Sequence, residues 1–211
     1  LRINYRGRTS QPSMTDLLPI TDTSDPLNIS KGNPSLKPSY TNSFMLFYNT
    51  FLPEKQQSMM ARLTFSNTIN SVSNTVTYDE ETGARITQPK NINGNWSASG
   101  GFVFNTPLKN KKFTVSTFSD GSYNNMVGFT SLSGQTDSQK NTTRSLNLSE
   151  RLNGTFRNDW FEFGLNGGIR YNVSKSTLQP QSDKETFDYS FGASSNVTLP
   201  WDVTVSTDAS Y

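Results

Sequence analysis

The stretch FEFGLNGGIRYNV, which runs from Phe161 to Val173, alternates between two kinds of residue. Its even-numbered positions are polar or glycine. Its odd-numbered positions are apolar or glycine: Phe161, Phe163, Leu165, Gly167, Ile169, Tyr171 and Val173. A period of two is typical of a β-strand with one apolar and one polar face, so the stretch predicts such a strand.

The same alternation recurs along most of the chain, in the ranges 96–104, 113–129, 146–156, 187–199 and 203–211. Glu150 interrupts the apolar positions of one range. The pattern from Met59 to Tyr78 changes phase near Asn70, where we expect a β-bulge. The predicted strands have roughly 12 to 20 residues, more than the ~5 to 6 usual in soluble sheets. We therefore expect an all-β chain folded as an antiparallel up-and-down meander.

The connections between these strands alternate in length. Short ones are expected at 53–57, 106–110, 157–159 and 200–202, and longer polar ones at 79–90, 131–142 and 176–184. Prolines concentrate between Gly7 and Tyr40, where no period is sustained, so this segment is expected to be one long extracellular loop. Tight turns that alternate with long loops are typical of a transmembrane β-barrel with short periplasmic turns and longer extracellular loops.

Composition excludes several classes of protein. The 14 Phe, 8 Tyr and 3 Trp are too many for a disordered chain. Absence of cysteine and histidine excludes disulfides, thiolate metal sites and Ser-His-Asp catalysis. The net charge of +2 is too small to indicate a nucleic-acid partner. We identify no catalytic residue, no metal site and no cofactor site, and we expect a protein that is not an enzyme.

Three features favour a membrane barrel over a soluble sandwich. The strands are long enough to cross an apolar band of ~25 Å at a ~45° tilt, which takes about 9 to 11 residues. Their polar positions, which include Arg151, Arg170 and Asp188, suit a wet lumen. Aromatic residues recur near the short turns, as in an interfacial girdle: Phe104, Phe113, Phe156, Trp160, Phe161 and Trp201. The alternative is a soluble or surface-exposed β-rich binding module without transport activity.

Two runs near the N-terminus carry a family resemblance. The run from Asn4 to Ser13, and then the run from Asp25 to Pro38 with its string Gly-Asn-Pro-Ser-Leu-Lys-Pro, resemble the barrel signature of TonB-dependent receptors. A strand-like stretch from Thr41 to Tyr48 follows them. Within those receptors the chain is most similar to the Bacteroidetes-type outer-membrane β-barrel proteins. The stretch from Asn4 to Tyr48 that contains these runs makes up about a fifth of the chain, and the rest matches in pattern alone.

The resemblance implies a barrel of roughly 22 strands closed by an N-terminal plug. The whole chain, 1–211, is then expected to be part of one outer-membrane barrel domain, with about seven to eight strands in 41–211. Both ends of the chain look cut, so the plug and the segment that contacts TonB are expected outside it. The implied function is ligand binding and nutrient uptake across the outer membrane of a Gram-negative cell. The expected partners are outer-membrane lipid, the TonB system through regions outside this chain, and a nutrient of open identity.

Arg151 and Arg170 are the candidate ligand-binding residues. Both fall at polar positions of predicted neighbouring strands, so they are expected to project into the lumen, where they could contact an anionic solute. The alternative is that they form ion pairs with Glu162, Asp188 or residues of the plug.

Overall fold

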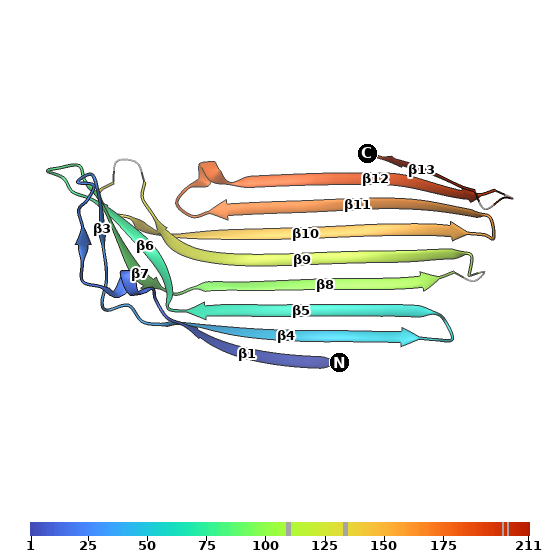
Figure 1. Cartoon of the computed structure of the whole chain (residues 1–211), viewed down its shortest axis with the longest axis horizontal. Coiled ribbons are helices and arrows are strands. Elements are labelled where there is room, and N and C mark those ends of the chain that lie inside the picture. The colour runs from blue at the N-terminus through green and yellow to red at the C-terminus, as the bar shows by residue number, and fades with distance from the viewer. Residues whose placement is uncertain (109–110, 133–134, 200, 202) are drawn as a thin grey trace.

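The computed structural model describes residues 1–108, 111–132, 135–199, 201 and 203–211. Its main feature is a curved sheet of nine long strands in the order β1-β4-β5-β8-β9-β10-β11-β12-β13, with every neighbouring pair antiparallel (Figure 1). The strands are β1 (Arg2–Ser10), β4 (Ser39–Leu52), β5 (Gln57–Ile69), β8 (Asn95–Pro107), β9 (Phe113–Thr130), β10 (Gln139–Arg157), β11 (Phe161–Ser176), β12 (Lys184–Thr198) and β13 (Thr204–Ser210). The predicted antiparallel meander is therefore confirmed.

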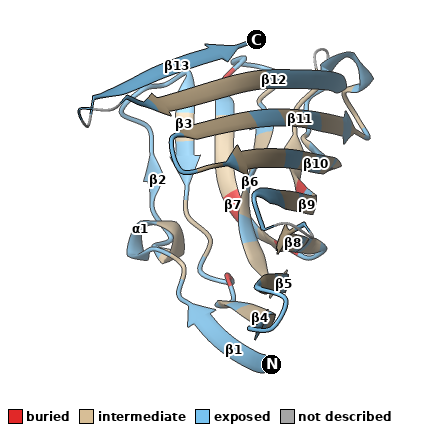
Figure 2. Ribbon diagram, turned by 90° about the vertical axis from the view of Figure 1, so that its right-hand side faces the viewer, coloured by how far each residue is buried: buried red, intermediate tan, exposed pale blue. Residues whose placement is uncertain are grey.

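A second sheet of four short strands stands at one end of the large sheet. It is formed by β2 (Thr21–Asp22), β3 (Asn28–Lys31), β7 (Arg85–Ile92) and β6 (Ser71–Tyr78), in that order. Between β1 and β2 lies the short helix α1 (Met14–Leu17), whose N-terminus is capped by Ser13. Viewed along the strands, β2, β3 and α1 stand on the side toward which the large sheet curves (Figure 2).

The connections at the two ends of the large sheet differ as expected. At one end β4 joins β5 through residues 53–56, and β10 joins β11 through residues 158–160. At the other end lie residues 131–132 and 135–138, residues 177–183 with the 3-10 turn Pro180–Ser182, and both segments that form the small sheet. The short connections expected at 106–110 and 200–202 lie partly outside the described residues. Among the residues described, no helix is long and apolar enough to cross a membrane.

Two expectations about the N-terminal half need correction. The single bulged strand expected from Met59 to Tyr78 is wrong, because the chain turns at Asn70 (φ 54°) and passes from β5 in the large sheet to β6 in the small one. Asparagine tolerates this left-handed backbone better than most residues. The segment expected as one loop from Gly7 to Tyr40 is shorter, since β1 continues to Ser10 and β4 begins at Ser39. Likewise, β7 occupies part of the loop expected at 79–90.

Burial is concentrated at the end that carries the small sheet. Within the described residues, the buried hydrophobic side chains are Leu36, Ala84, Ile92 and Val127, all in or beside that small sheet. The apolar side chains in the middle of the large sheet are exposed; Leu63, Leu165 and Ile169 are 58%, 55% and 52% exposed. A soluble domain rarely leaves so large a continuous apolar surface uncovered. The large sheet is thus a wall with two accessible faces, and its apolar face needs an apolar environment.

Candidate functional site

The register of the large sheet sorts its side chains onto two faces. Directly paired residues of neighbouring strands point to the same side. Phe44 pairs with Phe65, which in turn pairs with Ala98, and Leu46 pairs with Leu63. Each further strand pair up to β12 continues this arrangement, so the apolar residues of neighbouring strands form one continuous apolar face. The alternation predicted for single strands is thereby a property of the whole sheet.

One row of aromatic rings borders the apolar face toward the small sheet. Ring centroids lie 4.8 Å apart for Tyr5 and Phe44, 6.1 Å for Phe65 and Trp96, and 5.0 Å for Trp96 and Tyr123. These five residues come from β1, β4, β5, β8 and β9. We call them the upper aromatic row.

A second aromatic row lies near the short turns. Phe113 and Phe156 have centroids 4.6 Å apart, and Phe156 and Phe161 6.4 Å apart. The members of this lower aromatic row on the apolar face are Phe113, Phe156, Phe161 and Phe163. On β10 the apolar band between the rows runs from Leu146 to Phe156, which matches the about 9 to 11 residues of a tilted membrane-crossing strand. Two aromatic girdles around an apolar band are the outer features of a membrane barrel.

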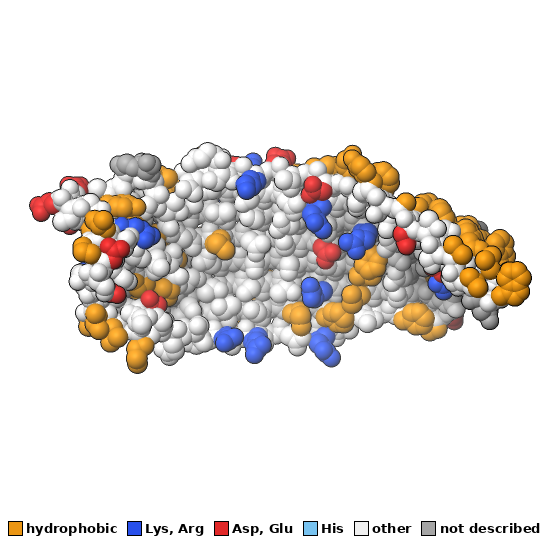
Figure 3. Space-filling view, turned by 45° about the horizontal axis from the view of Figure 1, so that its top comes forward, with side chains coloured by type: hydrophobic (Ala, Val, Ile, Leu, Met, Phe, Trp, Pro, Cys, Tyr) orange, Lys and Arg blue, Asp and Glu red, His pale blue; other side chains and the backbone are white. Residues whose placement is uncertain are grey.

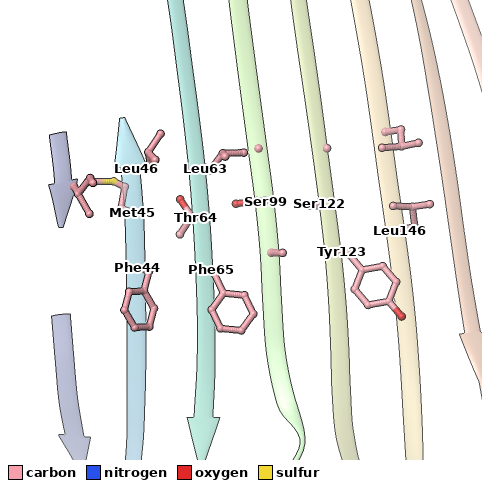
Figure 4. Close-up of a pocket in the computed structure, with 15 residues that line it drawn as sticks. Phe44, Met45, Leu46, Leu63, Thr64, Phe65, Ser99, Ser122, Tyr123 and Leu146 are labelled. Carbon is pink, nitrogen blue, oxygen red and sulfur yellow. The ribbon is translucent and has the colours of Figure 1, made fainter. Parts of the chain in front are cut away.

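A shallow apolar hollow of about 600 Å³ lies within this band (Figure 4). Its floor is formed by Gly100 and Gly121, which face each other across β8 and β9. Leu63 and Leu148 lean toward them: a Cβ built on Gly100 would lie 3.0 Å from Leu63 Cδ2, and one on Gly121 3.2 Å from Leu148 Cδ2. Polar atoms are nearly absent from the lining, so the hollow suits hydrocarbon and cannot hold a polar solute.

The opposite, concave face of the sheet is polar, and charged side chains gather across its middle (Figure 3). Their common feature is one register row, in which Arg62, Asp120, Arg170 and Asp188 are linked through the intervening Gly101 and Ser149. Arg151 is on the same face, two residues along β10 from Ser149. Signs alternate along this charged row. Gly101 separates Arg62 from Asp120 and Ser149 separates Asp120 from Arg170, whereas Arg170 and Asp188 are direct partners. The small side chains of Gly101 and Ser149 leave space beside the charges.

Arg151 and Arg170 lie on neighbouring strands of the same face, as the sequence predicted. They line a common hollow of about 180 Å³ together with Gly168, Asp188 and Ser190. Arg170 is directly opposite Asp188, but the two side chains make no ion pair within 4.0 Å.

The expected pairing of either arginine with Glu162 is wrong. Glu162 instead bonds Arg157 across the β10–β11 hairpin, with Nη2 2.6 Å from Oε2, and this is the one ion pair in the part of the chain that the structure describes. The exposed guanidinium groups of Arg62, Arg151 and Arg170 consequently keep their hydrogen-bond donors available. A guanidinium binds carboxylate and phosphate oxygens in a bidentate manner.

Arg62 and Asp120 were missed from the sequence. Each falls at a polar position of a long strand, but so do many serines and asparagines, and nothing local distinguishes the two charges. Only the strand order and register show that they share a row with Arg170.

Comparison of the sequence with known protein families agrees with this geometry. Residues 1–160 match the model of the outer membrane protein beta-barrel family. The chain belongs to this family. No match was found among curated proteins or among solved structures.

Membership of the outer membrane protein beta-barrel family indicates how the molecule is placed in the outer membrane. The protein is an outer-membrane protein, and the large sheet is a segment of its barrel wall. In such barrels short turns face the periplasm and longer loops face outward, so we expect the small sheet to be extracellular. The alternative of a soluble module is wrong, because the family is a membrane family and the apolar face has no cover among the described residues.

Proposed function

We propose that this chain is part of the barrel of a TonB-dependent receptor-like transporter, which binds a nutrient and brings it across the Gram-negative outer membrane. In this proposal the apolar face contacts outer-membrane lipid, and the polar face lines the lumen. The TonB system acts through regions outside this chain. The protein has no catalytic role and no nucleic-acid partner. The string from Gly32 to Pro38 supports the choice of receptor class.

The observation that carries the proposal is the charged row on the concave face. Exposed charges on a wet wall are solvated by water and add little to stability, so the wall does not need such a row to hold together. Arg62, Arg151 and Arg170 have no side-chain partner among the described residues, so their donors are open to a solute. They face a lumen, where a solute with carboxylate or phosphate groups would meet them.

The end of the barrel wall that carries the small sheet has a second polar surface. A hollow of about 600 Å³ lies between the small sheet and the end of β9, lined by Gln88, Lys90, Asn91, Phe129 and Asp137 among others. The Lys90 ammonium lies 5.9 Å from the centroid of the Phe129 ring. Its amide, carboxylate and ammonium groups offer hydrogen-bonding partners to a polar solute at this end of the sheet.

A genetic experiment in the native host tests the transport proposal. Strains that lack the full-length protein, TonB, or both are grown on limiting nutrients, one nutrient class at a time. We expect one class on which each single deletion slows growth and the double deletion adds nothing. Additive defects, or no defect on any nutrient, would leave a binding barrel without transport and refute the proposal.

Complementation then tests the charged row. The double variant Arg151→Ala/Arg170→Ala should restore growth poorly. The matched control is Arg144→Ala, because Arg144 is also an exposed arginine of β10 but lies at a position of the apolar face. Equal rescue by both variants would exclude the charged row from solute binding.

A further inference from the structure

Glu150 is a carboxylate on the apolar face of the barrel wall. Its register partners are Ser119 on β9 and Ile169 on β11, and its neighbours of the same parity along β10 are Leu148 and Leu152. It lies inside the apolar band, between Leu146 at the upper border and Phe156 in the lower aromatic row. An ionisable side chain at such a depth is costly in lipid and is normally retained for a function.

The surroundings of Glu150 form a small polar patch. Thr117 Oγ1 donates a hydrogen bond to Glu150 Oε1. Ser119 lies directly opposite Glu150, and its hydroxyl makes no side-chain hydrogen bond in the described part of the chain. A carboxylate has roughly four acceptor positions, so most of the hydrogen-bonding capacity of Glu150 is unused. We call Thr117, Ser119 and Glu150 the mid-band polar patch.

Exposed apolar side chains of Leu148, Leu152 and Ile169 border this patch, and two glycines lie just beyond them. Gly154 follows on the same face of β10, and a Cβ built there would meet no atom within 4 Å. Gly167 of β11 pairs with Leu152, and a Cβ there would touch only a backbone oxygen at 4.0 Å. Between transmembrane helices, small residues beside a polar group let two backbones approach closely, and these glycines leave similar space on the barrel wall.

We propose that the mid-band polar patch is the contact point of a homodimer, in which a second copy of this chain packs against β9 and β10 within the outer membrane. The patch is self-complementary, because it holds both an acceptor carboxylate and donor hydroxyls. Two copies with the same topology are related by a two-fold axis along the membrane normal, which brings groups of equal depth together. The carboxylate of one copy then accepts from the Ser119 hydroxyl of the other. Lipid chains could offer no such donor at this depth.

This inference depends on the barrel orientation and not on transport. Its test uses the full-length protein, freed of any cysteine outside this chain, in outer membranes and in lipid nanodiscs. Membranes with Ser119→Cys in one copy and Glu150→Cys in the other are oxidised, and we expect a disulfide-linked dimer. The matched control is Leu63→Cys. Leu63 is on the same apolar face but lies on β5, three strands from β10, so this variant should not cross-link. Equal cross-linking at Leu63, or a cross-link only to a different protein, would overturn the homodimer.

Energy transfer between labelled copies in nanodiscs separates a specific contact from crowding. Glu150→Leu should weaken dimerisation about tenfold or more, because a charge-assisted hydrogen bond is lost from each side, whereas Glu150→Gln should keep most of it. Both variants must retain the heat-dependent gel mobility of a folded barrel, and Glu150→Leu is expected to fold well because the new side chain suits lipid. Monomeric wild type, or unchanged dimerisation of Glu150→Leu, would refute the proposal.

Discussion

Trp96 of β8 stacks on Tyr123 of β9, with ring centroids 5.0 Å apart and ring planes inclined by 25°. The two residues are diagonal neighbours, since Trp96 pairs with Asn125 and Tyr123 with Ala98. The stack continues the row that begins with Tyr5 on β1 and Phe44 on β4. Side chains with a polar edge and a large ring suit the boundary between lipid and water. The upper aromatic row therefore fixes the depth of the sheet in the membrane and ties its strands together.

Removal of the Trp96 ring should destabilise the barrel. Trp96→Ala loses the stacking with Tyr123 and the contact with Phe65, which predicts a loss of about 1 kcal/mol or more in the free energy of unfolding. Urea titration of the full-length protein in lipid vesicles, followed by gel mobility, measures the change. Trp96→Phe keeps a ring in place and should cost clearly less. Equal losses for the two variants would show that the stacking contributes nothing.

Leu165 and Asn166 provide a test of which face meets lipid. Leu165 belongs to the apolar face and Asn166 to the polar face of the same strand, β11. Leu165→Arg puts a charge in the apolar band, which costs about 2 to 4 kcal/mol near the midplane of a barrel, whereas Asn166→Arg should cost little. The same urea titration compares them. Similar losses for both would contradict the assignment of the faces.

Spin labels at the same two positions remove the remaining ambiguity, since a charge is also damaging in a protein core. In bilayers the label at Leu165 should be relaxed by an agent dissolved in lipid, and the label at Asn166 by one dissolved in water. Protection of Leu165 from both agents would mean that another protein or the plug covers the apolar face.

The sequence alone was sufficient to predict the features that depend on a single strand. The alternation from Phe161 to Val173 correctly assigns each of those residues to a face, because parity along a strand needs no knowledge of its neighbours. The small sheet could not be predicted, since β3 and β7 are separated in sequence by more than fifty residues and pair in parallel through backbone groups alone. The exit from the large sheet at Asn70 depends equally on a remote contact, the hydrogen bond from its N–H to Asn93 Oδ1.

The candidate site likewise has a part that the sequence could predict and a part that it could not. Arg151 and Arg170 could be identified because they fall in the two most regular strands, whose adjacency follows from a short turn. Their relation to Arg62 depends on the order of five strands, from β5 to β11, and on the register of each pair. A one-residue shift in any pair would move the later charges to the other face.

Gly94 is a sensitive point in the junction between the small and the large sheet. Its φ of 117° is one that side chains rarely adopt, and a Cβ there would lie 2.9 Å from Val127 Cγ2. Gly83, at φ 71°, has nothing within 4 Å of such a Cβ. Gly94→Ala should therefore cost about 1 to 3 kcal/mol more than Gly83→Ala. Trypsin cleavage at Arg85 or Lys90 on intact cells should be faster in Gly94→Ala; faster cleavage in Gly83→Ala would contradict this account.

The side of the membrane on which the small sheet lies can be measured directly. Ser24 is exposed in the connection between β2 and β3, and Ser30 is exposed within β3, so both should be reachable from outside the cell. We expect cysteine at either position of the full-length protein to react with an impermeant maleimide on intact cells. The matched control is Glu54→Cys, because Glu54 is equally exposed but lies in the short turn between β4 and β5, at the opposite end of the sheet. It should react only after the outer membrane is permeabilised. Labelling of Glu54→Cys on intact cells, with Ser24→Cys and Ser30→Cys unlabelled, would mean that the barrel has the opposite orientation, and the short turns would then be extracellular.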